Sequence, residues 1–185
     1  MPKPAVEPGR QDFALAQQFA QARLARNVLG PRVSQSQFRE ACEDCFAVLK
    51  PLGVADRECV VRLEQVLQES DAQRDFIIRL NGLLHANRPI QDRFESFTAW
   101  LVGQELSDWW LVSVFPALVF PDRFAVLDPA SWLSPHAPRL PEQLDWTAYR
   151  LAQQAAHAER KRLGASADLL AVHAARSSRN TLSLA

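Results

Sequence analysis

Apolar residues recur every three to four positions along most of this chain. That spacing places them on one face of an amphipathic helix. The pattern covers residues 12–29, a stretch from Ser34 or Ser36 to 49, and residues 56–69, 70–85, 87–101 and 145–163. A short further helix is expected over 166–175. The pattern therefore predicts an all-α protein.

Several helix ends can be predicted from capping and breaking residues. Gly30 and Pro31 should end the first helix, because Gly readily adopts a left-handed conformation and Pro cannot continue a helix. Ser70 and Gln73 fit a capping box, in which each side chain bonds to a free backbone N–H of the other residue. Asp145 should cap the last long helix.

The most apolar part of the chain is residues 109–132, and three prolines interrupt it. A helix capped by Ser107 should enter this block. Pro116 lacks a backbone N–H and clashes with the carbonyl four residues earlier, so the helix should kink or end there. Because so apolar a segment has to be buried, we expect this block to lie at the centre of the fold.

Residues 120–127 are rich in Phe and Val, which would suit a strand. A lone strand would have no partner for its backbone, so we expect an extended, buried segment instead. The predicted fold is an irregular single-domain bundle of seven to eight helices over residues 11–175. A disordered lead is expected over 1–10 and a flexible tail over 176–185.

Composition and charge narrow the possible functions. The 185 residues are 48% hydrophobic and 23% charged, as in an ordinary globular domain. A net charge of zero argues against polyanion binding through bulk charge. Residues 146–185 nevertheless hold six Lys/Arg and two Asp/Glu, about +4. Arg160, Lys161, Arg162 and Arg176 are therefore candidate phosphate contacts, although an ordinary solvated face is the simpler interpretation.

Targeting and membrane signals are missing from the sequence. The first ten residues have no apolar core of the kind a secretory signal needs. The longest apolar run, about twelve residues including a proline, is shorter than a membrane span. The expected location is therefore the cytoplasm, with no membrane partner.

The cysteines and histidines do not indicate a metal or redox centre. Cys42 and Cys45 form a CxxC pair, but it falls within a predicted helix on an apolar face, whereas redox pairs stand at helix starts. A zinc site would need two more ligands, and Cys59 and His85 are the only nearby candidates. We expect buried core cysteines, no metal and no cofactor. Nucleophile and phosphate-loop motifs are also lacking, so an enzyme is not favoured.

Arg123 is the polar residue that merits most interest in the apolar block. Asp122 and Asp128 flank it, and a guanidinium near buried surface needs an acceptor. An internal Arg–Asp clamp is the simpler interpretation. The alternative is a pocket for an anion or a partner's carboxylate, which Trp109 and Trp132 could line.

Parts of the chain resemble the C-terminal region of a bacterial protein family that has no known activity. The motifs are the Trp-rich block, FPDRFAVLDP, DWTAYRLAQQ and LGASADLLAV, within residues 57–172. The family pattern is a Trp/Pro-rich helix, Pro-Asp-Arg-His with Leu-Lys-Pro, Asn-Trp-x-x-Tyr and Gly-Ala-x-Asp. The resemblance implies a helical fold and a prokaryotic origin. Phe124 replaces the family's His and Asp128 its Lys, so a role of those residues would not carry over.

The sequence thus favours a non-enzymatic interaction or regulatory protein, such as an adaptor or a small subunit of a bacterial assembly. A protein partner or self-association is expected. The alternative is a nucleic-acid-associated protein that uses the basic C-terminal helix. A hydrolase or transferase with a site at Arg123 and Asp128 ranks last.

Overall fold

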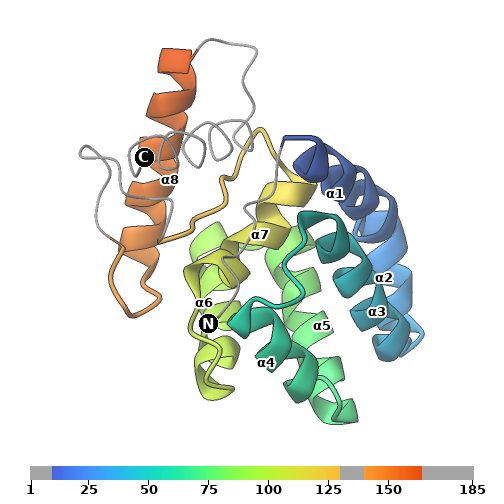
Figure 1. The fold of residues 1–185 in the computed structure, drawn as a ribbon. Coiled ribbons are helices and arrows are strands. Elements are labelled where there is room, and N and C mark those ends of the chain that lie inside the picture. The colour runs from blue at the N-terminus through green and yellow to red at the C-terminus, as the bar shows by residue number, and fades with distance from the viewer. Residues whose placement is uncertain (1–9, 130–139, 164–185) are drawn as a thin grey trace, which may run out of the picture. The chain divides into compact units, whose positions relative to one another are not determined.

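The computed structural model describes residues 10–129 and 140–163, and this part of the chain is mostly helical (Figure 1). It contains eight α-helices, one short 3₁₀ helix and no strand, which confirms the all-α prediction. The elements are α1 (Arg10–Arg23), α2 (Arg26–Ser34), α3 (Phe38–Leu49), η1 (Lys50–Leu52), α4 (Glu58–Val66), α5 (Ser70–His85), α6 (Ile90–Gly103), α7 (Trp109–Val119) and α8 (Trp146–Leu163).

The chain divides into two compact units, residues 1–106 and 107–185. A single domain over 11–175 stays a prediction. The expected disordered lead (apart from Arg10, the first residue of α1), the helix over 166–175 and the tail over 176–185 lie outside the described residues. Among the helices of the described part, none combines the length and apolar content that a membrane crossing requires.

Helices α5 and α3 make most of the helix–helix contacts of the first unit. Helix α5 packs against α2, α3 and α6, and α3 also packs against α1 (Figure 1). The Phe76 ring of α5 lies 6.0 Å from the ring of Phe97 and 5.5 Å from that of Trp100, both on α6. Burying an apolar side chain of this size stabilises a fold by about 1.5–3 kcal/mol. The α5–α6 contact is therefore a major part of this core.

The predicted helix over 12–29 is in fact two helices, and its predicted end is wrong. Ala25 has extended backbone angles and separates α1 from α2. Helix α2 then continues through Gly30 and Pro31 to Ser34. A proline inside a helix loses one backbone hydrogen bond but already has a helical φ. The left-handed conformation that follows α2 belongs to Ser36, with φ 57°.

The break between α1 and α2 coincides with a contact that is distant in sequence. Nε2 of His85, at the end of α5, donates a hydrogen bond to the backbone oxygen of Leu24 at 2.8 Å. A carbonyl near a helix end needs a hydrogen-bond donor of this kind. The break therefore depends on packing against α5, which periodicity within the segment does not show.

A buried carboxylate connects the first three helices. Asp44 of α3 has 5% of its side chain exposed. Its Oδ1 accepts a hydrogen bond from Nη1 of Arg23 at 2.6 Å, and Nη2 of Arg32 lies 2.7 Å from its Oδ2 as an ion pair. Arg23 belongs to α1 and Arg32 to α2. The buried carboxylate of Asp44 thus binds one arginine from α1 and one from α2, and it connects both helices to α3.

The capping box predicted at Ser70 is wrong. Ser70 is the first residue of α5, and Glu69 at the cap position makes no side-chain capping bond. Nε2 of Gln73 instead donates to the backbone oxygen of Leu67 at 2.8 Å. Leu67 ends α4, so Gln73 satisfies a carbonyl of the preceding helix because the two helices are joined by so short a turn.

Of two other predicted helix caps, one is confirmed and one is wrong. Asp145 caps α8 as predicted, with its Oδ2 accepting from the Ala148 N–H at 2.7 Å. The cap of α7 is Asp108 and not Ser107, because Oδ1 of Asp108 accepts from the Leu111 N–H at 2.8 Å. A side-chain oxygen that accepts from the third residue after it is the usual N-cap geometry.

Helix α7 lies in the most apolar part of the chain. Every residue from Trp109 to Leu118 is buried, as expected of a helix that is apolar on all sides. The helix passes through Pro116 and reaches Val119, so the proline does not end it. The Phe120 N–H donates to the Pro116 oxygen at 2.8 Å, which keeps the last turn helical. Burial of the surrounding apolar surface outweighs the one bond that proline loses.

The predicted extended, buried segment over 120–127 is confirmed only in its last part, residues 125–127, because residues 121–123 form a turn in which Asp122 and Arg123 are exposed. Ala125 and Leu127 are buried and lie outside any helix or strand. The side-chain amide of Gln153, on α8, accepts from the Ala125 N–H at 2.8 Å and donates to the Ala125 oxygen at 3.0 Å. The Ser113 hydroxyl of α7 accepts from the Leu127 N–H at 2.8 Å. Side chains thus supply the partners that a neighbouring strand would otherwise provide.

Candidate functional site

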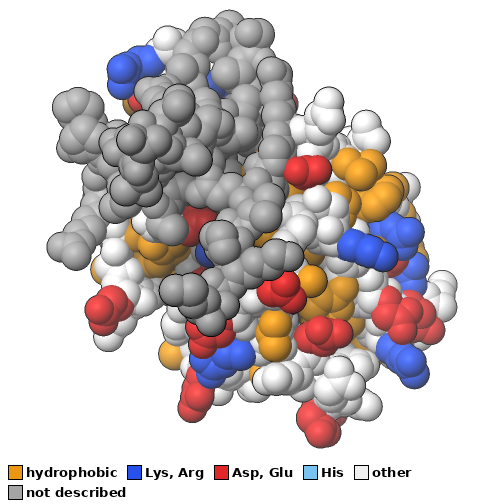
Figure 2. All heavy atoms as spheres, in the orientation of Figure 1, with side chains coloured by type: hydrophobic (Ala, Val, Ile, Leu, Met, Phe, Trp, Pro, Cys, Tyr) orange, Lys and Arg blue, Asp and Glu red, His pale blue; other side chains and the backbone are white. Residues whose placement is uncertain are grey.

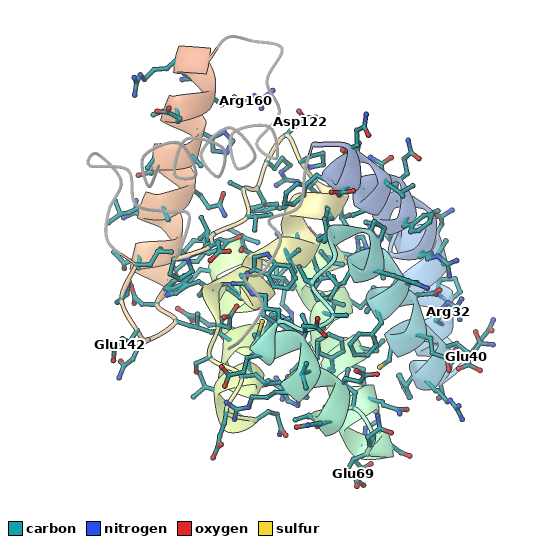
Figure 3. The ribbon with its side chains drawn as sticks, in the orientation of Figure 1. Arg32, Glu40, Glu69, Asp122, Glu142 and Arg160 are labelled. Carbon is teal, nitrogen blue, oxygen red and sulfur yellow. The ribbon has the colours of Figure 1, made fainter. Side chains whose placement is uncertain are left out.

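The predicted internal clamp between Arg123 and a flanking aspartate is wrong, because a different arginine, Arg160, pairs with Asp122. Arg123 is exposed, and its guanidinium lies 5.8 and 5.6 Å from the ring centres of Phe120 and Phe124. The Asp122 carboxylate pairs instead with Arg160 of α8, Nη2 to Oδ1, at 3.4 Å (Figure 3). Cations stack favourably on aromatic faces, which gives an exposed guanidinium a stable position without a carboxylate. The clamp therefore joins the turn after α7 to α8.

A second side chain of α8 supports the same turn. Nε2 of His157 donates to the backbone oxygen of Arg123 at 3.0 Å, and Nη1 of Arg160 donates to the oxygen of Asp122 at 3.2 Å. His157 and Arg160 are three positions apart, so they share one face of the helix. That spacing is the signal by which the sequence could have indicated this contact.

The other members of the predicted pocket do not form a recognisable site. Trp109 is buried, and its indole N–H donates to the Pro141 oxygen at 2.6 Å. Asp128 is half-buried, and Trp132 lies outside the described residues. A binding role for this group stays a prediction.

The basic residues of α8 are largely engaged with their own chain. Arg160 is held by Asp122, and Arg162 pairs with Glu159 at 2.9 Å, whereas Lys161 is exposed. Arg176 lies outside the described residues. The nucleic-acid alternative stays a prediction, and two of its three described phosphate contacts already have carboxylate partners.

The cysteines are core residues, as predicted. Cys42, Cys45 and Cys59 are free and buried. Burial raises the pKa of the Cys42 thiol to about 12, with a further contribution from Glu43, and raises the pKa of Cys45 well above its usual range. Within residues 10–129 and 140–163, no group of His, Cys, Asp and Glu is placed to hold a metal ion.

We predict that Cys42 and Cys45 react with N-ethylmaleimide at pH 8 only when the chain opens. A pKa near 12 lowers the thiolate fraction by about a thousandfold relative to an ordinary cysteine. Labelling followed by mass spectrometry should therefore be slow in native protein and fast in urea. Native labelling as fast as in urea would contradict the buried position.

His85 lies at the end of α5 and is half-buried. The end of a helix favours a charged imidazole, but desolvation lowers the pKa of this half-buried side chain. The hydrogen bond with the Leu24 oxygen raises the pKa of His85 and so opposes the desolvation. The positive charges of the nearby Arg26 and Arg93 lower this pKa further. His85 is therefore a neutral structural donor at neutral pH.

An apolar groove opens between α3, η1 and α4, and we name it the α3–α4 groove. Its volume is about 310 Å³, and its lining residues are Phe46, Ala47, Leu49, Lys50, Val54, Ala55, Val60 and Glu64. Val61, next to Val60, is 37% exposed. Figure 2 shows hydrophobic side chains on the surface in this region, with acidic ones beside them. Phe46 is half-buried at this groove.

The stretch from Phe38 to Glu69, which supplies the lining of the α3–α4 groove, exposes more acidic than basic side chains, and its arginines Arg57 and Arg62 are half-buried. Between Phe38 and Glu69 the exposed acidic residues are Glu40, Glu43, Asp56, Glu58, Glu64 and Glu69. The exposed basic residues of this stretch are Arg39 and Lys50. Arg39 pairs with Glu43 at 3.2 Å. A partner for this surface is therefore expected to be basic.

A second groove lies between α5 and α6, and we name it the α5–α6 groove. Its volume is about 370 Å³, and its lining residues are Asp75, Ile78, Arg79, Gly82, Ala86, Arg88, Asp92, Arg93 and Ser96. Unlike the first groove, it contains three guanidinium groups. Sequence reasoning did not find either groove, because each depends on how two helices are placed against one another.

Comparisons with known proteins give no match: no protein-family model, curated protein or solved structure is similar to this chain. The resemblance to a bacterial family therefore stays a prediction.

Proposed function

We propose that this protein is a non-enzymatic interaction protein that binds a helical segment of a partner protein in the α3–α4 groove. The observation that carries the proposal is the groove itself, whose lining is apolar apart from Lys50 and Glu64. Its volume of about 310 Å³ is at the lower end of the range of pockets that bind ligands. Exposed apolar surface with a polar rim is typical of partner-binding sites.

The occupant we propose is an amphipathic helix with apolar residues on one face and Lys or Arg beside them. Helical partners of this kind place residues spaced three and four apart into an apolar groove. Addition of a strand is not supported, since the described part of the chain has no sheet edge. The acidic surface around the groove favours basic flanking residues, which would also speed association. From the sequence alone, we also propose that the protein is bacterial and that it is located in the cytoplasm.

The test uses a fluorescein-labelled amphipathic peptide with a Leu face and a Lys/Arg face, titrated with the full chain by fluorescence anisotropy. Ala47 lines the groove and is half-buried. Ala47→Gln places a larger polar side chain there without changing the charge. We expect saturable binding by the wild type and at least about tenfold weaker binding by the variant.

The matched control is Ala99→Gln, the same change at an exposed position of α6. It should bind the peptide as the wild type does. Added salt should weaken binding, because the charges around the groove are exposed. Wild-type protein that shows no saturable binding, or Ala47→Gln protein that binds equally well, would overturn the proposal. Tight binding of duplex DNA that leaves the peptide unbound would favour the nucleic-acid alternative.

A further inference from the structure

The α5–α6 groove has a chemistry different from that of the α3–α4 groove. Two of its guanidiniums link the helices: Nη1 of Arg79 donates to the oxygen and the hydroxyl of Ser96 at 3.2 and 3.1 Å, and Nη1 of Arg93 donates to the Leu83 oxygen at 2.9 Å. These contacts cross from α5 to α6 and from α6 to α5. The positions of both groups are thus fixed by the fold.

The acceptors that Arg79 contacts on Ser96 are neutral, so they do not cancel its charge. Within the part of the chain that the structure describes, neither Arg79 nor Arg88 forms an ion pair with a carboxylate. The two acids of the groove have electrostatic partners of their own. Asp75 shares Arg74 with Asp71, at 3.3 and 3.4 Å, and Asp92 lies in the first turn of α6, where the helix dipole stabilises a carboxylate.

Apolar surface lies next to these guanidiniums. Ile78 is 45% exposed. Gly82 of α5 and Ala86, the residue after α5, also line the groove and have little or no side chain. Gly82 has an ordinary helical conformation, and a Cβ added there would meet nothing within 4 Å. A glycine inside a helix is unfavourable relative to alanine, and neither backbone angle nor packing within this chain requires it. Its effect is to let another molecule approach the α5 backbone.

We propose that the α5–α6 groove binds a small organic anion, a carboxylate or phosphate monoester with an apolar body. Arg79 and Arg88 would hold the oxyanion, because the planar guanidinium matches both groups with two parallel hydrogen bonds. Ile78 and the surface at Gly82 would contact the apolar body. The groove volume of about 370 Å³ suits a ligand of this size. This site is separate from the α3–α4 groove and does not depend on it.

The experiment titrates the full chain with phenyl phosphate, benzoate and inorganic phosphate by isothermal calorimetry. The first two probes distinguish phosphate from carboxylate, and the third tests whether the apolar body matters. Arg88→Gln removes a cation, and Gly82→Leu fills the groove without a change of charge. We expect each to weaken binding of the preferred aromatic anion by at least about tenfold. Arg39→Gln, the same change at an exposed position of α3 outside the lining, is the control and should bind normally.

Three results would overturn the proposal. They are no saturable binding of either aromatic anion, equal binding by Gly82→Leu protein, and an Arg39→Gln loss as large as that of Arg88→Gln, which would indicate unspecific attraction. Circular dichroism verifies that each variant is folded. Gly82→Leu should leave peptide binding at the α3–α4 groove unchanged, so failure of one proposal is distinguishable from failure of the other.

Discussion

Replacement of Gln153 by Leu should lower the free energy of unfolding by about 2–4 kcal/mol, because it leaves two buried backbone groups without partners. Gln153 accepts from the Ala125 N–H and donates to the Ala125 oxygen, and both residues are buried. Leu has nearly the same volume, so packing is retained while the hydrogen bonds are lost. Urea unfolding measures the difference.

The control for this change is the next residue. Gln154 is exposed on the same helix, and Gln154→Leu should change stability by less than about 0.5 kcal/mol. Hydrogen exchange at the Ala125 amide should speed up in the Gln153 variant alone. If both variants unfold at the same urea concentration, the extended segment is held by apolar burial and not by the amide of Gln153.

Gln153→Glu offers a further check on the direction of the two bonds. A carboxylate accepts from the Ala125 N–H but cannot donate to the Ala125 oxygen, whereas the protonated acid can do both. Burial disfavours the charged form, so the pKa of the introduced carboxyl should be raised in the folded state. The deficit relative to the wild type should therefore shrink as the pH falls through that raised pKa.

Asp44→Ala should lower the free energy of unfolding by about 2–3 kcal/mol. The carboxylate is 5% exposed and holds Arg23 and Arg32, so its loss separates α3 from two helices. The energy is less than that of a fully buried pair, because both guanidiniums retain access to water. Denaturant unfolding by circular dichroism gives the measurement.

The adjacent acid is a direct comparison for Asp44. Glu43 is 65% exposed and pairs with Arg39 on the surface, so Glu43→Ala should cost less than about 0.5 kcal/mol. Asp44→Asn keeps the size of the side chain and removes its charge, and it should lie closer to Asp44→Ala than to the wild type. A small effect of Asp44→Ala would indicate that apolar packing alone places α1 and α2 on α3.

Local sequence rules predicted those features that depend on neighbours within about four residues along the chain. Periodicity identified α5, α6 and α8, and it placed Cys42 and Cys45 in the core. The Asp145 cap was predicted because its partner, Ala148, is three residues away. The absence of a partner strand predicted an extended segment around Ala125.

Most of the contacts that sequence reasoning missed join residues that are distant in the chain, although the Asp108 cap of α7 is a local one. Asp44 has an acidic side chain in an amphipathic pattern, which indicates a surface position, yet its Arg23 partner lies 21 residues away and draws it inside. The Gln153 side chain accepts a hydrogen bond from the backbone of Ala125, 28 residues away in the chain. Arg160 pairs with Asp122, 38 residues away in the chain, whereas Arg123 was the predicted partner. Polarity alone does not indicate which polar residues will find such partners.

By itself, the sequence determined that this chain forms amphipathic helices around apolar faces, because burial of apolar surface follows directly from residue spacing. Only the tertiary structure decided where those helices stop, which polar side chains are buried between them, and where the α3–α4 and α5–α6 grooves open. The physical reason is that an apolar face specifies burial without specifying its partner, whereas a groove or a buried ion pair exists only once two particular helices are held in one geometry.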